Sequence, residues 1–252
     1  MCVLATCLLL LVCGAGGSIV PSTMPFKLHR GQPSQPSRAV AWFIATHKLP
    51  VDFVDVNALA GETTTPEFTA KNPLQAVPVL ELEDGTFLNE SSAILLYLTK
   101  RFNVKGEVPD DAQAYANVLS AMFSHADLAR QVTNGLVRPN GAKLRNPNLT
   151  WADITAAISK NEADLLWSLK ILEDKLGKHE YIAGNVWTLA DYNVAAELSQ
   201  WPGVNSILPD ALKLQKFPNV QKYLERVAQR EGWEAFIAPF KHLVNVLQIP
   251  SQ

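Results

Sequence analysis

Short apolar segments with the length and composition of β-strands are spaced along the first part of the chain. Residues 26–29 alternate apolar and polar side chains, and residues 51–56 and 77–82 are rich in valine, leucine and phenylalanine. An Asp-Gly dipeptide ending at Gly85 is typical of a hairpin turn, so a returning strand is expected to begin at Phe87. The pattern therefore predicts a sheet of four strands.

Apolar residues at helical spacing predict two helices among these strands. Residues 39–47 follow Pro36, which suits the first turn of a helix because its missing N–H has no partner there. Residues 93–98 follow Ser91 and Ser92, either of which can cap a helix. The order is β-α-β, a loosely structured stretch, and then β-β-α. It predicts a mixed four-stranded α/β sheet with helices on both faces.

After residue 102, apolar residues recur only at helical spacing. A linker is predicted at residues 103–109, which contain Gly106 and Pro109. One helix is expected from 110 to about 138, and leucines between 165 and 176 form an apolar stripe suited to core packing. The predicted organisation is a leader at 1–23, an α/β domain at 24–102, the linker, an all-α domain at 110–245 and a tail at 246–252.

Thr188 and Asp191 are spaced as a helix capping box. The threonine hydroxyl can accept from the N–H three residues on, while the aspartate accepts from the N–H of the threonine. A helix is expected to continue from there to Gln200. Because burying uncapped helix donors is costly, both residues are predicted to have a structural role and not a catalytic one.

Composition and charge narrow the class of partner. The 252 residues are 48% hydrophobic and 18% charged, which is ordinary for a globular protein, and the net charge is −2. No long basic run is present, so nucleic acid is not expected as a main partner. The strongly apolar stretch at 3–12 is too short to span a bilayer, so stable membrane insertion is not expected.

Cysteine and histidine usage argues against metal and disulfide chemistry. Cys2, Cys7 and Cys13 all lie in the leader, so the remaining sequence has no disulfide, no Cys-x-x-Cys motif and no thiolate ligand. The five histidines lack the spacing of a metal site. No metal is predicted.

The leader allows two interpretations. Residues 1–20 are uncharged, and their apolar core followed by small residues resembles a secretory signal. However, no Lys or Arg precedes that core, and Met24 leads directly into the first predicted strand. Sequons at Asn89 and Asn148 fit a secreted protein, but a glycan on Asn89 would sit on candidate ligand-binding residues. We expect a cytoplasmic protein, with the secretory pathway as the alternative if the leader is a signal peptide.

A serine precedes the first predicted helix, where free N–H groups and the helix dipole favour negative charge. A thiol has a pKa of about 8.5, and a hydrogen bond donated by Ser34 to a ligand sulfur would favour the thiolate. Lowering that pKa by about two requires roughly 2.7 kcal/mol, which one charge-assisted hydrogen bond and the dipole can supply. Ser34 is therefore predicted to be a donor and not a nucleophile. The alternatives are an ordinary cap at Ser34 or a role for Ser37, with Arg38 adding positive charge.

Three motifs in order carry a family resemblance. They are Ser34-Gln35-Pro36-Ser37-Arg38-Ala39-Val40, then Asn72-Pro73-Leu74-Gln75-Ala76-Val77-Pro78, and Asn89-Glu90-Ser91-Ser92. Together with the capping box they resemble the glutathione transferases, most of all the theta class. The resemblance implies a thioredoxin-like N-terminal domain, an all-helical C-terminal domain, a homodimer and a role in detoxification. It also implies glutathione as co-substrate, with no other cofactor, and a small electrophile as the second substrate.

The resemblance also assigns roles around glutathione. Ser34 would be catalytic, Val77 would pair with the peptide through its backbone, and Pro78 would form a cis bond that shapes this turn. Glu90 would meet the ammonium of the γ-glutamyl end, and Ser91 its carboxylate at a helix N-terminus. A trans proline at an edge strand is the alternative for Pro78.

Two positions depart from the family pattern. Residues 61–65, with Thr63 at their centre, lack the basic or histidine side chain common there, and Ala76 replaces a common lysine. Both help to hold the glycyl carboxylate in relatives, so we expect modest affinity for glutathione. Gln35 or Lys71 would compensate.

The second substrate is expected against the helical domain. Phe123 and His125 resemble a family stretch that faces the thiol, although a buried structural histidine is the alternative for His125. Aromatic residues near the C-terminus would cover the pocket or pack in the core.

The leading function is conjugation of glutathione to small electrophiles or reduction of hydroperoxides. The alternative is a non-catalytic transferase-like module for protein association, against which the presence of Ser34, Glu90 and Ser91 argues. A thiol-disulfide oxidoreductase is rejected because no cysteine lies near position 34. A zeta-like isomerase would need a different motif around the serine.

Overall fold

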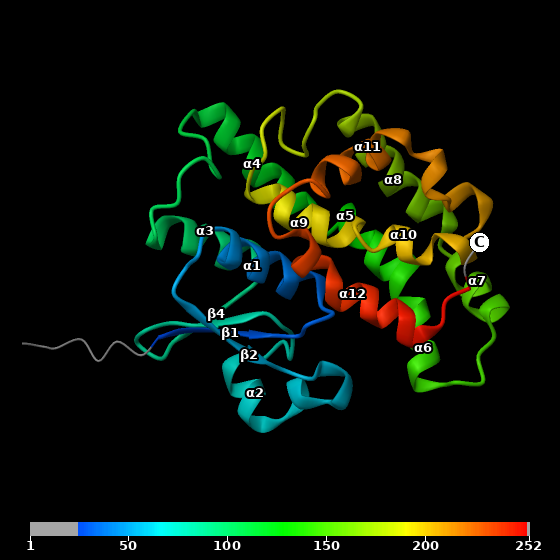
Figure 1. Ribbon diagram of the computed structural model, residues 1–252, viewed down its shortest axis with the longest axis horizontal. Helices are drawn as coiled ribbons and strands as arrows, with labels where there is room; N and C mark the ends of the chain where they lie inside the picture. Colours follow the sequence, from blue (N-terminus) through cyan, green and yellow to red (C-terminus); the bar gives the residue numbers. More distant parts are fainter. Residues whose placement is uncertain (1–24, 251–252) are drawn as a thin grey trace, which may run out of the picture.

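The computed structural model of this protein describes residues 25–250 (Figure 1). The predicted leader at 1–23 lies outside the described residues, as do the last two residues of the predicted tail. In the described part of the chain, no helix has both the length and the apolar character needed to cross a membrane.

A mixed sheet organises the first part of the molecule. Its strands are β1 (Phe26–Arg30), β2 (Val51–Asp55), β3 (Val79–Glu81) and β4 (Phe87–Asn89), in the order β2-β1-β3-β4. The first two strands are parallel, and β3 runs antiparallel to both of its neighbours. This sheet, followed by a helical part, confirms the predicted fold class.

Helices cover both faces of the sheet, as predicted. In Figure 1, α1 (Gln35–Thr46) and α3 (Ser91–Arg101) lie on one side and α2 (Pro66–Lys71) on the other. The stretch expected to be loosely structured therefore contains a helix, together with the 3-10 turns Ala58–Ala60 and Glu62–Thr64. Its start is set locally, because the Thr65 side chain accepts a hydrogen bond from the Phe68 N–H at 3.2 Å and proline follows the threonine.

Helices make up the rest of the described chain. In order they are α4 (Ala112–Ser124), α5 (Ala129–Gln131), a π-helix (Val132–Val137), α6 (Arg138–Arg145), α7 (Trp151–Ser159), α8 (Glu162–Leu176), α9 (Leu189–Leu198), α10 (Trp201–Val204), α11 (Pro218–Val227) and α12 (Trp233–Leu247). Short 3-10 turns at Asn205–Ile207, Asp210–Leu212 and Leu214–Lys216 join α10 to α11. The proposed domain bounds stay a prediction.

The single helix predicted from residue 110 to about 138 is wrong. The chain leaves the α conformation at Leu128, whose φ and ψ are −110° and −80°. It then forms the π-helix, in which Gly135 lies against the side chain of Leu165 on α8 so closely that a Cβ would clash. Apolar spacing along one segment does not encode this contact, because it depends on a helix that comes later in the chain.

Helix α9 is the centre of the helical part, and every one of its residues is buried. The predicted capping box is present at its start, where Asp191 accepts from the Thr188 N–H at 2.9 Å. Asp191 also accepts from the Ile182 N–H at 3.0 Å and from the Tyr223 hydroxyl at 3.2 Å. The box therefore joins the helix start to two other segments, which supports its predicted structural role.

Helix α1 lies between the sheet and the helical part. Trp42 stacks on Phe236 of α12, with ring centroids 4.5 Å apart, and meets Tyr192 of α9 edge-on at 5.2 Å. At the end of α1, His47 Nε2 lies 2.8 Å from Glu107 Oε1, which also accepts from the Tyr192 hydroxyl at 3.2 Å. Burial raises the pKa of Glu107. These contacts fix α1, and therefore the serine at its start, relative to α9 and α12.

Candidate active site

A cavity of about 720 Å³ lies where the start of α1 meets the helical part. Ser34 and Gln35 line it from α1, and Leu59 and other residues after β2 line it from the same side. The opposite wall consists mainly of apolar side chains of α12 and residues at the start of α6, namely Val137, Arg138, Asn140, Phe240, Leu243, Val244 and Leu247. The predicted serine thus lies in the wall of a cavity whose opposite side is largely apolar.

Ser34 is the residue that precedes α1, with extended φ and ψ of −69° and 126°. Its N–H donates to the Gly31 carbonyl at 3.0 Å, and its carbonyl accepts from the Arg38 N–H at 2.9 Å. Its side chain makes no capping hydrogen bond to the helix. The alternative of an ordinary cap therefore lacks its hydrogen bond, and the half-buried hydroxyl is left for a ligand.

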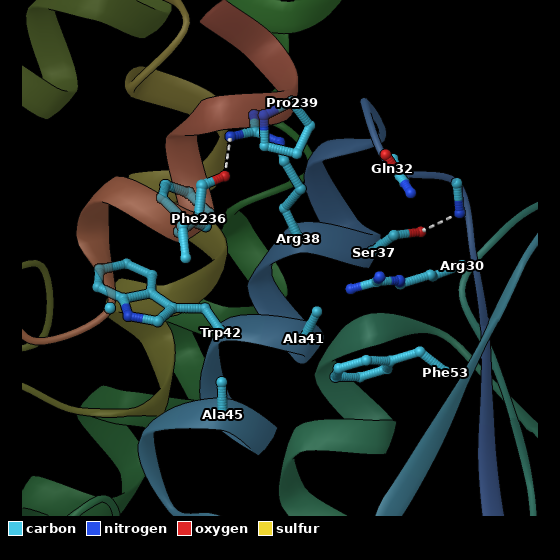
Figure 2. A pocket seen from close by; sticks show the side chains of 13 residues that line it. Arg30, Gln32, Ser37, Arg38, Ala41, Trp42, Ala45, Phe53, Phe236 and Pro239 are labelled. Carbon is cyan, nitrogen blue, oxygen red and sulfur yellow. Dashed lines mark hydrogen bonds between the residues drawn. The ribbon is translucent and has the colours of Figure 1, made fainter. Parts of the chain in front are cut away.

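Ser37 and Arg38 belong to another surface of α1 (Figure 2). The Ser37 hydroxyl is fully buried and accepts from the Gly31 N–H at 3.2 Å. Figure 2 shows Arg38 reaching from α1 to Phe236 and Pro239 of α12, where its guanidinium donates to the Phe236 carbonyl at 3.3 Å. Both line a separate cavity of about 280 Å³ that does not include Ser34.

Arg38 does not line the cavity that contains Ser34. Burial lowers the pKa of Arg38 to about 10, against the opposing effect of Glu197. The geometry favours Ser34 over Ser37 as the hydroxyl available to a ligand.

The other predicted glutathione residues line a smaller cavity of about 180 Å³. Val77, Pro78, Glu90 and Ser91 all contribute to it. The Val77-Pro78 bond is cis, which confirms that prediction. Glu90 has a φ of 71°, in the left-handed region, so its backbone turns sharply before Ser91 begins α3.

The first turn of α1 connects the two cavities. Gln35 lines the larger cavity, and Pro36 lines the smaller one. The loop before α1 also lies against the cis turn, since a Cβ at Gly31 would be 3.1 Å from a methyl of Val77 and 3.4 Å from Cβ of Ser34. A peptide in the smaller cavity thus has a short path to Ser34.

Asn72 holds the loop that leads to the cis bond. Its side-chain amide donates to the Ala76 carbonyl at 2.7 Å and accepts from the Leu74 N–H at 3.0 Å. Asn72 is buried, so these bonds satisfy a side chain that water does not reach. The asparagine that begins the second motif therefore supports the backbone that presents Val77.

His125 and Phe123 lie in different environments. His125 lines the smaller cavity, with Nε2 3.7 Å from Oε1 of the buried Glu197. Phe123 is 70% exposed and does not line either of the two cavities. Neither residue lines the larger cavity.

Arg130 was not identified from the sequence. It lines the smaller cavity, and its Nη1 donates to Glu197 Oε1 at 3.1 Å. Lys71, which was expected to compensate for Ala76, pairs instead with Glu67 at 3.1 Å. The only signal for Arg130 was its charge in a mostly apolar segment, and the break after α4 that places it was not predicted.

Comparisons with known proteins follow the same division of the chain. Residues 28–107 match the family model of the glutathione S-transferase N-terminal domain, and residues 156–231 match that of the C-terminal domain. Rat glutathione S-transferase theta-2 is 33% identical over 230 residues, which cover 89% of each chain. Human glutathione S-transferase theta-1 is 33% identical over 232 residues, covering 90% of this chain and 92% of the relative.

Solved structures agree with the sequence relatives. An epsilon-class glutathione S-transferase from the housefly, Musca domestica, has a TM-score of 0.70 at 26% identity, covering 88% of this chain and 97% of that one. Glutathione transferase F7 from Populus trichocarpa has a TM-score of 0.72 at 25% identity, covering 85% of this chain and 99% of that one. The matched domains and the identity to curated relatives together show that this chain belongs to the glutathione S-transferase family, with theta-class enzymes among its relatives.

Proposed function

We propose that this protein stabilises the thiolate of glutathione with the Ser34 hydroxyl. The glutathione is then conjugated to small electrophiles or reduces hydroperoxides. The observation that carries the proposal is the position of Ser34. Its hydroxyl precedes α1, makes no capping bond, and lies in the wall of the larger cavity beside the turn that leads to the smaller one. A thiolate placed there would meet a donated hydrogen bond and the positive end of a helix dipole.

Glutathione is proposed to bind across the two cavities. Its γ-glutamyl end would lie in the smaller cavity, where Glu90 supplies a negative charge for the ammonium and the start of α3 at Ser91 receives the carboxylate. The backbone of Val77 would pair with the cysteinyl residue in the manner of an added strand. The thiol would then point to Ser34 at the start of α1.

The chemistry needs little from the protein beyond positioning and charge stabilisation. The thiol releases its proton to solvent, and a sulfur lone pair forms a bond to the electrophile while the leaving group departs with its bonding electrons. With a hydroperoxide, the thiolate attacks the terminal oxygen and the O–O bond breaks to give an alcohol and a sulfenic acid. A second glutathione reduces the sulfenic acid, giving the disulfide and water.

The larger cavity is the proposed site of the second substrate. Phe240, Leu243 and Val244 give its α12 wall an apolar surface, which favours electrophiles with an apolar body. Phe123 lies outside this cavity, and its contact with the second substrate stays a prediction.

Turnover tests the proposed function directly. We expect the purified chain to consume glutathione with at least one of an aryl chloride, an alkyl halide, an epoxide and cumene hydroperoxide, with the uncatalysed rate subtracted. Glutathione binding in calorimetry without turnover of any of them would support the alternative, a non-catalytic module for protein association.

A homodimer and a cytoplasmic location are further parts of the proposal. Large apolar side chains are exposed on α4 and beside the sheet, as expected for a covered face. They are Tyr115 and Phe123 on α4, with Leu74 and Phe87 on the sheet domain. Sedimentation equilibrium of the full chain measures the mass of the assembly.

Ala76→Lys is expected to lower the KM for glutathione several-fold. Ala76 adjoins Val77, whose backbone is proposed to pair with the cysteinyl residue, so a lysine side chain at position 76 would extend to the glycyl carboxylate of the next residue. The matched control is Leu74→Lys, on the same loop but outside the smaller cavity, because Leu74 is 71% exposed. Steady-state kinetics with varied glutathione measure the change, and equal effects of the two variants would show that only net charge matters.

A further inference from the structure

A chain of buried polar side chains runs from the helical core to the start of α1. The Gln35 side-chain amide donates to the carbonyl oxygen of Gln200, and the Gln200 amide donates to the Thr133 hydroxyl at 2.8 Å. The Thr133 hydroxyl in turn donates to a carboxylate oxygen of Glu197. Gln200, Thr133 and Glu197 are buried, and Gln35 and Gln200 both line the larger cavity. The chain joins three segments that are distant in sequence.

The carboxylate at one end of this chain fixes the direction of every bond in it. An ionised carboxylate only accepts hydrogen bonds, so Thr133 must donate to Glu197 and can then only accept from Gln200. Gln200 therefore turns its amide nitrogen to Thr133 at 2.8 Å, with longer contacts of 3.5 and 3.4 Å to the Ala196 and Glu197 carbonyls, and its carbonyl oxygen to Gln35. Gln35 must donate to that oxygen, which leaves its own carbonyl oxygen for a ligand.

Glu197 is held in place by side chains from the other cavity. Arg130 donates to its Oε1 at 3.1 Å, and His125 Nε2 lies 3.7 Å from the same oxygen. Arg130 and His125 both line the smaller cavity. One carboxylate, only 1% exposed, thus links the wall of the smaller cavity to a side chain in the wall of the larger one.

The π-helix supplies the middle member of the chain. Thr133 is its second residue, and Val137 at its end lines the larger cavity. Turns of this kind are uncommon and frequently occur at functional sites. The wider turn here directs a hydroxyl to two buried polar partners, Glu197 and Gln200.

We propose that Thr133 and Gln200 are positioning residues, which orient the Gln35 amide for glutathione under the control of the Glu197 charge. The inference rests on the proposed function, since Gln35 adjoins Ser34. In the oriented state, the Gln35 carbonyl oxygen accepts an N–H from the cysteinyl or glycyl part of glutathione. Without the chain of hydrogen bonds, the amide rotates freely and an orientation cost is added to binding.

Thr133→Val tests the inference, because it keeps the shape of the side chain and removes its hydroxyl. We expect the Kd of glutathione, measured by calorimetry, to rise about tenfold. The kcat at saturating glutathione and the KM of the electrophile are expected to change by less than twofold. Thr133→Ser retains the hydroxyl and is expected to restore the Kd.

A double-mutant cycle separates positioning from a general loss of structure. In a Gln35→Ala background, Thr133→Val is expected to cause no further rise in the Kd, because its effect passes through Gln35. Additive effects of the two substitutions, or an unchanged Kd for Thr133→Val alone, would overturn the inference. If the valine variant does not fold, Thr133→Ala makes the same test with room for water beside Glu197, and the same two outcomes apply.

Calorimetry also keeps this inference distinct from the proposed function. The Kd of glutathione does not depend on turnover, so the comparison can be made even if no electrophile reacts. If the chain binds glutathione but turns over no electrophile, and Thr133→Val still raises the Kd as expected, the catalytic proposal alone would be refuted.

Discussion

Ser34→Ala is expected to lower kcat/KM for glutathione conjugation about 30-fold at neutral pH and to raise the pKa of the bound thiol by roughly 1.5. A hydrogen bond to a charged group contributes about 2 kcal/mol, and 1.36 kcal/mol corresponds to one pKa unit. The Ser34 hydroxyl makes no capping bond, so its removal leaves the helix start unchanged. Thiolate absorbance in the ultraviolet, recorded against pH with glutathione bound, measures the pKa.

Ser37→Ala is the matched control. It removes the same group three residues further along, but that hydroxyl is buried and accepts from the Gly31 N–H. We expect this variant to be less stable and to leave the pKa of the bound thiol unchanged. A rise in that pKa for Ser37→Ala, with none for Ser34→Ala, would reverse the assignment of the two serines.

The pH profile provides a second measurement on Ser34→Ala. If the serine acts by favouring the thiolate, the variant needs a higher pH to reach the same ionised fraction. At saturating glutathione, the kcat of Ser34→Ala is therefore expected to approach that of the wild-type protein as the pH rises above the new thiol pKa. If the ratio of the two kcat values is constant across the pH range, Ser34 does not act through the ionisation of the glutathione thiol.

Asp191→Ala is expected to lower the free energy of unfolding by about 4 kcal/mol, because several buried donors lose their acceptor together. The carboxylate accepts from the Ile182 and Thr188 N–H groups at 3.0 and 2.9 Å. It also accepts from the hydroxyls of Thr188 and Tyr223, each at 3.2 Å. Denaturant unfolding of the two proteins, followed by circular dichroism, measures the difference.

A second capping box in the same chain provides the control for Asp191. Asp153 accepts from the Thr150 N–H at 2.8 Å at the start of α7, but this box is exposed. Asp153→Ala is expected to cost much less than Asp191→Ala, because water can replace the carboxylate as acceptor for the exposed donors. Equal losses for the two variants would show that capping alone, and not the buried network, accounts for the effect of Asp191.

The pH dependence of this difference follows from the same burial. Burial raises the pKa of Asp191 to about 6, despite the four donors, so the folded state holds this proton at pH values where the unfolded state has lost it. The stabilisation by Asp191 is therefore fully present below about pH 4 and decreases as the pH rises to about 6, by about 3 kcal/mol in total. Subtracting the stability of Asp191→Asn, which cannot titrate, at each pH isolates this contribution.

The parts of the molecule that were predicted correctly are those with a local cause. The cis bond before Pro78 and the capping box at Asp191 both depend on residues within a few positions. Helix α3 begins where it was expected, but the predicted cap at Ser91 or Ser92 is wrong, because Glu90 precedes the helix and no side chain caps it. The strands of the sheet also follow from short runs of apolar residues. In each case the sequence separation between cause and effect is small, so periodicity and motif spacing contain the information.

The parts that were missed depend on contacts between distant segments. Gln35 and Gln200 are 165 positions apart, and no spacing rule relates them. Arg130 comes to the smaller cavity only because the helix after residue 112 ends near Ser124 and the chain turns. The part of the larger cavity formed by residues of α6 was likewise not predicted, because it also lies beyond the break after Ser124.

Because α1 contacts both α9 and α12, the sheet domain of this protein cannot readily be recombined with the helical part of a relative. Trp42 has aromatic neighbours on α9 and α12, Arg38 donates to carbonyls of both, and Gln35 bonds to Gln200 between α9 and α10. A chimera that joined this sheet domain to the helical half of a relative would keep the glutathione motifs but meet a different surface along α1. Recombination at the linker would therefore require matched substitutions on α1, whereas point changes at Leu243, Val244 or Leu247 would alter the larger cavity at positions other than Phe236, which contacts α1.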